Sequence, residues 1–154
     1  MRLKGSYLLP GTRQQVWDLL NDPVRLSKCL PGCEKLEPDG TDRYKLAVKF
    51  GLAAVSGSYS GAVELAEKRP PESLVLRLEG KGVPGFMKGR GTLRLAAKDG
   101  ETEVRYEGEA QVGGLVAAVG QRMLEGAARM IIQQFFDNAA KQLRKAVNSQ
   151  SESG

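Results

Sequence analysis

Alternation of apolar and polar residues dominates the middle of this chain. Between residues 43 and 112, five stretches place apolar side chains at every second position, with mostly charged or hydroxyl side chains between them. This period of two is typical of β-strands that have one dry and one wet face. Turn-forming sequences separate the stretches, at Pro38-Asp39-Gly40, Arg69-Pro70-Pro71 and Asp99-Gly100. The pattern predicts an antiparallel meander of about six strands.

The residues before the meander predict one strand and two short helices. Residues 3–9 are expected to form the strand. Thr12 and Gln15 then have the spacing of a capping box at the start of a helix. Asp22 followed by Pro23 predicts the start of a second helix, because proline is favoured at the first helical position.

The C-terminal part predicts one long helix. From about Leu115 to Val147 no proline interrupts an amphipathic pattern, which corresponds to roughly 50 Å of helix. The apolar residues fall on two stripes: Val116, Val119, Met123, Ala127, Met130 and Ile131 on the first, and Leu124, Ile132 and Phe136 on the second. We expect the first stripe to face the sheet and the second to pack beneath the first helix or to be a docking surface.

This order of elements predicts an α+β helix-grip fold. About seven antiparallel strands would curve around the long helix, because only the dry face of the sheet can cover an apolar helix stripe. Glycines inside the strands, at Gly57, Gly61, Gly89 and Gly108, indicate bulges or bends that curl the sheet. We expect a single domain over residues 1–147, a cavity beneath the helix and a disordered polar tail at residues 148–154.

A glycine-rich segment, Gly80 to Gly91, stands between two predicted strands and reads GKGVPGFMKGRG. It predicts a flexible apolar loop at the sheet edge, which would form the mouth of the cavity. Lys81, Lys88 and Arg90 flank its apolar residues. Such a tip can contact an anionic lipid surface, and the alternative is an ordinary loop with solvated lysines.

Composition excludes several classes of function. The chain has 154 residues, a net charge of +5, two cysteines and no histidine. Cys29 and Cys33 alone are too few ligands for a structural zinc site, so no metal is expected. The cations are spread over the predicted wet face, which argues against nucleic acid. Without an apolar span or a secretory signal, we expect a cytoplasmic protein.

The sequence contains no motif that indicates a catalytic site. Gly80-x-Gly82-x-x-Gly85 matches a dinucleotide fingerprint, but Pro84 and the following strand leave no helix to hold a pyrophosphate. A serine–histidine or cysteine–histidine pair is impossible without histidine. The carboxylates of the predicted strands fall on the wet face, so only tyrosines place polar groups inside; these are Tyr7, Tyr59 and Tyr106.

Several blocks of sequence together resemble the family of the G subunit of carbon monoxide dehydrogenase, over about residues 1 to 140. The blocks are Gly5-Ser6-Tyr7, residues 16–23 (VWDLLNDP), residues 29–34 (CLPGCE), Gly80-Lys81-Gly82 with Pro84-Gly85-Phe86, and residues 110–114 (AQVGG) running to residues 119–122 (VGQR). This family lies in the START-like, polyketide-cyclase-like (SRPBCC) superfamily of helix-grip proteins.

The resemblance implies a non-catalytic accessory protein to a molybdenum hydroxylase of the carbon monoxide dehydrogenase type. Its implied roles are to link that enzyme to the membrane and to hold a hydrophobic molecule, a respiratory quinone or prenyl lipid, that accepts electrons. No tightly bound cofactor is expected, and the implied location is peripheral, at the inner face of the cytoplasmic membrane.

We therefore expect a hydrophobic-ligand binding protein without catalytic residues. The predicted ligand-binding residues are Trp17, Leu46, Val48, Tyr59, Leu76, Leu78, Phe86, Met87, Tyr106, Val119, Met123, Ala127 and Met130. Phe86 and Met87 would act as a gate together with the Cys29–Cys33 loop, and Tyr59 and Tyr106 would donate hydrogen bonds to a quinone carbonyl. The alternatives are a cyclase or dehydratase of the same superfamily, which needs an interior carboxylate or a tyrosine with a displaced pKa, and an interaction scaffold whose cavity is filled by its own side chains.

Overall fold

The computed structural model describes the backbone of residues 1–153 and the side chains of residues 1–145. Its strands form one antiparallel sheet in the order β1-β7-β6-β5-β4-β3-β2. The strands are β1 (Arg2–Leu9), β2 (Cys33–Pro38), β3 (Arg43–Phe50), β4 (Gly57–Arg69), β5 (Ser73–Gly82), β6 (Gly85–Lys98) and β7 (Glu101–Gly113). The helices are α1 (Arg13–Asn21), α2 (Pro23–Cys29) and α3 (Gln121–Ser153), with 3₁₀ turns η1 (Ala53–Val55) and η2 (Leu115–Val119).

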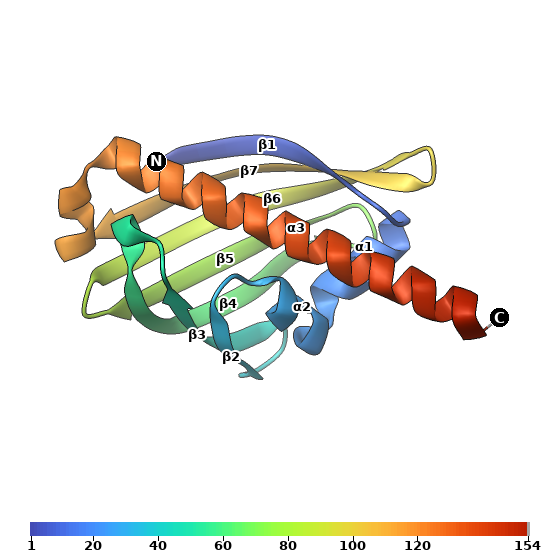
Figure 1. Cartoon of the computed structure of the whole chain (residues 1–154), viewed down its shortest axis with the longest axis horizontal. Coiled ribbons are helices and arrows are strands. Elements are labelled where there is room, and N and C mark those ends of the chain that lie inside the picture. Colours follow the sequence, from blue (N-terminus) through green and yellow to red (C-terminus); the bar gives the residue numbers. More distant parts are fainter. Residues whose placement is uncertain (154) are drawn as a thin grey trace.

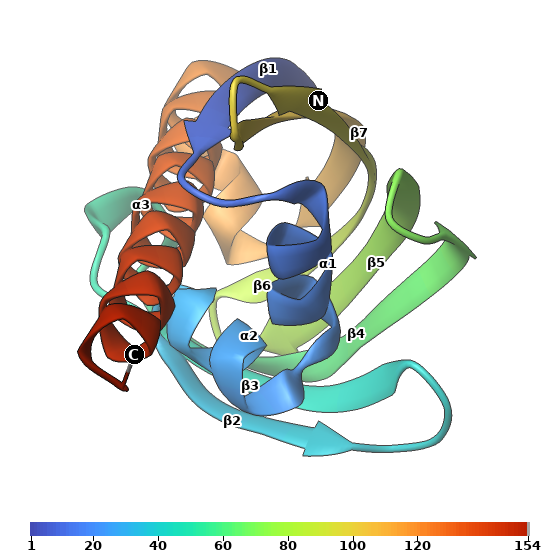
Figure 2. The same ribbon diagram turned by 90° about the vertical axis from the view of Figure 1, so that its right-hand side faces the viewer.

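The sheet curves around α3, which lies across its concave side (Figures 1 and 2). We call the concave side the inner face and the solvent side the outer face. Buried inner-face residues such as Leu74, Leu93 and Val104 alternate with exposed outer-face residues such as Arg94 and Arg105. The predicted meander, its wet and dry faces and the helix-grip architecture are confirmed.

The predicted helix starts are also confirmed. The Thr12 hydroxyl accepts a hydrogen bond from the Gln15 backbone N–H at 3.2 Å, and the Gln15 side chain accepts one from the Thr12 backbone N–H at 2.8 Å. The Asp22 carboxylate accepts a hydrogen bond from the Val24 backbone N–H at 3.0 Å. These side chains satisfy N–H groups that have no partner within the helix.

The prediction of a long loop at Gly80–Gly91 is wrong. Pairing between β5 and β6 continues to Gly82 and Gly85, so the turn consists of Val83 and Pro84 alone. A side chain at Gly82 would collide with the carbonyl oxygen of Ser58 on β4. Glycine is therefore needed here for close strand approach, and the segment forms a hairpin.

The start and orientation of the long helix also differ from the prediction. Gly120, at φ 96°, separates η2 from α3, so α3 begins at Gln121 instead of Leu115. Val119, Met123 and Met130 are 41%, 56% and 58% exposed, so the assignment of these residues to the sheet-facing stripe is wrong. The buried side of α3 carries mainly the second stripe and its continuation: Leu124, Ala127, Phe136, Ala139, Ala140 and Leu143.

The side chains of the expected tail, residues 148–154, lie outside the described residues, so disorder there stays a prediction.

Buried apolar residues form two separate cores. The large core joins α1 and α2 to the C-terminal half of α3 and to the strands beneath, and includes Trp17, Cys29 and Phe136. The small core lies at the other end, where Val55 of η1 and Val116 of η2 meet Leu124 and Ala127 of α3. Between the two cores the inner face carries residues that belong to neither, such as Leu46, Leu78 and Met87, and this is where the candidate site lies.

Candidate functional site

The candidate site is the stretch of inner face between the two cores. Three rows of paired residues cross it from strand to strand: Leu46–Gly61–Gly80–Met87, Val63–Leu78–Gly89–Ala110 and Leu65–Leu76–Gly91–Gly108. Leu46 and Leu78 are only half-buried and belong to neither core. Apolar side chains alternate with glycines here, so the surface is apolar with missing side-chain volume.

Glycines at this site have two different roles. A side chain at Gly61 would collide with the carbonyl oxygen of Glu79, so this glycine allows close approach of β5 to β4. No register shift occurs at Gly61, so it marks a bend rather than a bulge. At Gly80, in contrast, an added Cβ would meet nothing closer than 3.7 Å, with Tyr59 and Met87 as the nearest side chains. The inner face at Gly80 therefore accommodates an added Cβ in ordinary van der Waals contact.

The two inner-face tyrosines differ in their hydrogen bonding. The Tyr59 hydroxyl is buried and donates to the carbonyl oxygen of Val55 at 3.1 Å, and burial raises the pKa of Tyr59. The Tyr106 ring stacks on Phe136, with ring centres 5.6 Å apart, and lies across Gly5. Among the described residues the Tyr106 hydroxyl has no hydrogen-bond partner, so of this pair it is the one whose donor remains available to a ligand.

Acidic groups near the inner face are few. The Tyr7 hydroxyl donates to the Asp137 carboxylate, which also accepts a hydrogen bond from Gln133 at 3.1 Å. The hydrogen bond to Asp137 is the main cause of the raised pKa of Tyr7. Glu64, Glu79 and other strand carboxylates point outward, as the alternation predicts. Asp137 is thus the carboxylate next to the Tyr7–Phe136–Tyr106 ring stack.

The structure brings together eight of the predicted ligand-binding residues and separates the rest. On the inner sheet face or the facing side of α3 lie Leu46, Val48, Tyr59, Leu76, Leu78, Met87, Tyr106 and Ala127. Trp17 is packed inside the large core, while Val119, Met123 and Met130 are exposed. Phe86 covers Gly113 on the outer face and is 51% exposed, so it does not line the inner face. The ligand-binding role of all these residues stays a prediction.

Sequence reasoning missed one inner-face position and one half-buried residue of α3. Gly80 was not recognised as a wall position, although it continues the alternation of Leu74, Leu76 and Leu78. Phe135 of α3 is half-buried and packs against the large core. Extending the period-two pattern of β5 through Gly80 would have identified the first.

Several exposed apolar side chains gather at the end of the molecule beside the small core. We call this group the apolar end; it consists of Val83, Phe86, Leu115, Val119 and Met123. The turn of the β5–β6 hairpin, η2 and the first turn of α3 meet there (Figure 1), and the Val116 N–H donates to the Pro84 carbonyl at 2.6 Å. Val83 and Leu115 are 91% and 75% exposed. Exposed apolar side chains grouped in this way are a candidate contact surface.

The Cys29–Cys33 segment lies away from the apolar end. Cys29 is part of the large core, where burial raises its pKa to about 11, and its carbonyl accepts a hydrogen bond from Asn138 of α3. Both cysteines are free thiols. The structure therefore ties Cys29 to the large core and places Cys33 opposite Val48 of β3, and the gating role of this segment stays a prediction.

The described residues contain no cluster suited to a metal ion. They hold no group of three or more histidine, cysteine, aspartate and glutamate side chains placed to bind one. Within the same part of the chain, no helix combines the length and the hydropathy needed to cross a bilayer.

Solved structures with this fold are numerous. A conserved protein from Geobacillus kaustophilus is 41% identical and superimposes with a TM-score of 0.91, over 95% of this chain and 97% of that one. A START superfamily protein from Mycobacterium smegmatis has a TM-score of 0.75 at 10% identity, over 94% and 98% of the two chains. The Zhui aromatase/cyclase from Streptomyces sp. R1128 has a TM-score of 0.66 at 14% identity, over 96% and 95%. The last two likenesses show the START-like fold alone.

No curated protein sequence is similar enough to this chain to count as a match. The sequence profile of CoxG, the G subunit of carbon monoxide dehydrogenase, in contrast matches residues 5–144, which is nearly the whole chain. Together with the START-like fold, this match shows that the chain belongs to the CoxG family of carbon monoxide dehydrogenase subunits.

Proposed function

We propose that this protein is a non-catalytic accessory protein that binds a hydrophobic molecule between the inner face and α3. The observation that carries the proposal is the apolar, glycine-rich stretch of inner face between two separate cores, with half-buried Leu46 and Leu78 and a site at Gly80 that accommodates an added Cβ. Family membership supports an accessory role beside a carbon monoxide dehydrogenase-type molybdenum hydroxylase.

A prenyl quinone or another lipid suits this surface chemically. Burying roughly 400 Å² of isoprenoid surface contributes on the order of 10 kcal/mol before the costs of association. Ordering of the ligand and loss of its translational and rotational freedom offset much of this favourable free energy. The remainder is sufficient for micromolar affinity without a strong polar contact. The Tyr106 hydroxyl supplies one donor for a quinone carbonyl. A respiratory quinone is therefore the ligand we propose.

A cyclase or dehydratase function is less well supported. The likeness to an aromatase/cyclase is at 14% identity and concerns the fold alone. The carboxylate next to the inner aromatic residues, Asp137, already accepts hydrogen bonds from Tyr7 and Gln133. If the protein catalysed a cyclisation or dehydration, and this activity were lost in Asp137→Asn or Tyr106→Phe, the enzyme function would be favoured over the accessory role.

Filling the space at Gly80 tests the ligand site. In Gly80→Leu the new side chain would occupy the room beside Tyr59 and Met87, so we expect affinity for ubiquinone-1, measured by fluorescence or calorimetric titration, to fall at least tenfold. Gly126→Leu is the matched control, because Gly126 is exposed on α3 with nothing within 4 Å of an added Cβ. Equal affinity of the two variants, or no binding of quinones by the wild type, would refute the proposal.

The apolar end provides the proposed contact with the membrane. The exposed cations Lys81, Lys88 and Arg122 flank its apolar side chains, a combination suited to an anionic bilayer. We expect flotation with phosphatidylglycerol vesicles, little flotation with phosphatidylcholine vesicles, and loss of flotation in Val83→Asp. Val24→Asp is the control, since Val24 is 65% exposed on α2, away from the apolar end. Unchanged flotation of Val83→Asp would exclude this contact.

A further inference from the structure

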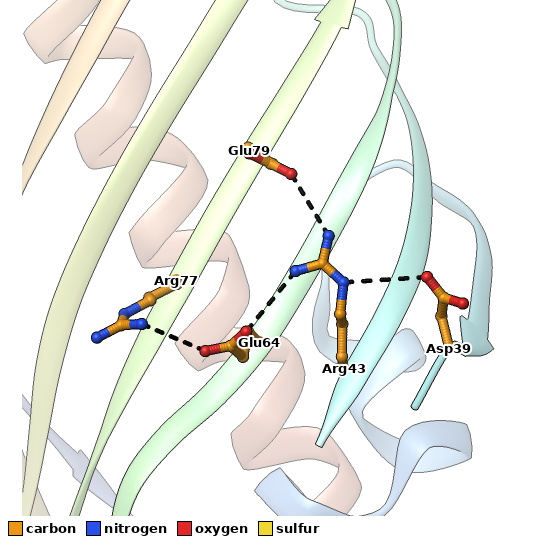
Figure 3. A network of polar contacts seen from close by, with 5 residues as sticks. All are labelled: Asp39, Arg43, Glu64, Arg77 and Glu79. Atoms are coloured by element: carbon orange, nitrogen blue, oxygen red, sulfur yellow. Dashed lines mark hydrogen bonds and ion pairs between the residues drawn. The ribbon is translucent and has the colours of Figure 1, made fainter. Parts of the chain in front are cut away.

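The outer face of the sheet carries two different arrangements of arginine side chains. On β3, β4 and β5, Arg43 lies within 4 Å of Asp39, Glu64 and Glu79, and Glu64 also contacts Arg77 (Figure 3). Both Arg43 and Arg77 thus have a carboxylate partner. Such a network needs no further ligand.

On β1, β7 and β6 a row of cations and hydroxyls has no carboxylate in it. Strand pairing places Ser6 opposite Arg105, Arg105 opposite Arg94, and Arg94 opposite Ser73. Like charges directly opposite each other on neighbouring strands are destabilising. Two arginines in that position therefore indicate a place where an anion would stabilise the sheet.

The nearest carboxylate compensates only one of these arginines. Glu103 accepts a hydrogen bond from Arg105 at 2.5 Å and lies 3.6 Å from Lys98. The hydrogen bond from Arg105 is also the main cause of the lowered pKa of Glu103. Among the described residues no carboxylate lies within 4 Å of Arg94 or of Lys4. Arg94 thus remains available, while Lys4 lies opposite Glu107 on β7 without forming an ion pair within 4 Å.

A hollow of about 660 Å³ lies over this row, within the size range of small-molecule sites. Its charged residues and its serine and threonine are Lys4, Ser6, Thr92, Arg94, Glu103, Arg105 and Glu107. A second hollow of about 490 Å³ shares Lys4, Thr92 and Glu107 with the first and continues toward Arg2, Arg90 and Arg129. Three cationic side chains, two carboxylates and two hydroxyls thus line one open hollow of the outer face.

We propose that this outer-face hollow binds a phosphate or diphosphate group. Guanidinium groups bind phosphate oxygens through paired, charge-assisted hydrogen bonds, and an oxyanion between Arg94 and Arg105 would remove their mutual repulsion. Ser6, Thr92 and Lys4 supply further donors around it. Glu107 and Glu103 limit the excess of positive charge, so the site suits a small phosphorylated molecule and not a nucleic acid strand. The site is separate from the hydrophobic-ligand site on the inner face.

The test is a nuclear magnetic resonance titration with inorganic phosphate and with pyrophosphate, at ionic strength held constant with sodium chloride. We expect saturable shifts on β1, β6 and β7, with pyrophosphate bound at least tenfold more tightly than phosphate. Arg94→Gln should weaken pyrophosphate binding at least tenfold. Arg43→Gln should change it less than twofold, because Arg43 lies on the same face with three carboxylate neighbours.

Two further measurements identify the source of the phosphate group and distinguish this site from the hydrophobic-ligand site. Binding of glycerol phosphate indicates a soluble ligand, whereas binding only to phosphatidic acid vesicles, lost in Arg94→Gln, indicates a lipid headgroup. Affinity for ubiquinone-1 should be unchanged in Arg94→Gln, so failure here does not affect the hydrophobic-ligand proposal. Shifts that rise linearly with concentration, or equal weakening by Arg94→Gln and Arg43→Gln, would overturn the inference.

Discussion

At the scale of single residues, Tyr59 and Tyr106 share the inner face but differ in what their hydroxyls do. The Tyr59 hydroxyl holds η1 in place through the Val55 carbonyl, whereas the Tyr106 hydroxyl has no partner among the described residues. We expect Tyr59→Phe to lower the free energy of unfolding by about 1 kcal/mol, because it removes a buried hydrogen bond. Tyr106→Phe should change it by less than about 0.5 kcal/mol. Urea unfolding curves measure both; equal losses would contradict this division.

Cys29 gives the protein an expected sensitivity to alkaline pH. Burial raises the pKa of this thiol to about 11, above the ordinary value of 9.0. The unfolded chain therefore loses its thiol proton at lower pH than the folded protein does. The contribution to stability is complete below pH 9 and is lost as pH rises toward 11, by up to about 1.4 kcal/mol per pH unit.

The measurement compares unfolding free energies of wild type and Cys29→Ala at pH 8 and pH 10. Cys29→Ala should be less stable at pH 8, because it leaves a cavity in the large core. The loss of stability between pH 8 and pH 10 should be smaller in the variant, since other titrating groups are common to both. Parallel pH profiles would show that the thiol contributes no pH dependence.

At the scale of elements, the curvature of the sheet depends on particular glycines. Gly61 has the Glu79 carbonyl where a side chain would stand, whereas Gly80 on the next strand has space. We expect Gly61→Ala to destabilise the protein by about 2 kcal/mol or more, since the strands must move apart. Gly80→Ala should cost less than about 1 kcal/mol. Thermal unfolding of the pair tests this, and similar melting temperatures would contradict it.

The sequence was sufficient to predict the strands and the starts of the short helices. Both depend on local patterns: the alternation of Leu74, Leu76 and Leu78, for example, or the Thr12–Gln15 capping box. These signals are independent of which distant segment the element packs against. For that reason the meander, its turns near residues 38–40, 69–71 and 99–100, and the order of elements agree with the structure, whereas the turn between β5 and β6 does not.

The apolar residues in the first turns of α3 do not show which side of the helix is buried. Two apolar stripes are present there, and which of them packs against the rest of the protein depends on the residues that continue each stripe toward the C-terminus. The stripe of Met123 and Met130 continues into Gln133 and Asp137, which are exposed, whereas that of Leu124 and Phe136 continues into Ala139, Ala140 and Leu143, which are buried. Small buried alanines contribute little to an apolar pattern, although they allow α3 to approach α1 and α2 closely.

The candidate site was predicted in part for a related reason. The inner-face leucines followed from alternation, but Phe86 was assigned to the wrong face because the hairpin was taken as a loop. Because β6 runs without a break from Gly85, its side chains alternate between the two faces of the sheet. This alternation places Phe86 on the outer face and Met87 on the inner face. The outer-face arginine row needs the register between β6 and β7, which no local pattern contains.

At the scale of the whole molecule, the main core and the proposed ligand site are separated along the long axis. The large core includes both short helices and the C-terminal half of α3, while the end with η1, η2 and the β5–β6 hairpin is held by the small core and by the Tyr59–Val55 and Val116–Pro84 hydrogen bonds. Regions with few buried contacts open more readily than the main core. The proposed ligand site therefore lies beside the part of the fold that can open without global unfolding.

This separation predicts a specific pattern of hydrogen exchange. Without ligand, backbone amides of β1, β7 and α3 next to the large core should exchange slowest, and those of η1, η2 and the β5–β6 hairpin fastest. Added ubiquinone-1 should slow exchange in the second group, because the ligand bridges the sheet and α3 beside the small core, and should leave the first group unchanged. Hydrogen–deuterium exchange with mass spectrometry measures this, with Gly80→Leu as the control that should not respond. Protection spread evenly over both ends would mean that the two cores act as one cooperative unit, and the ligand would then have to enter by global opening instead of through the apolar end.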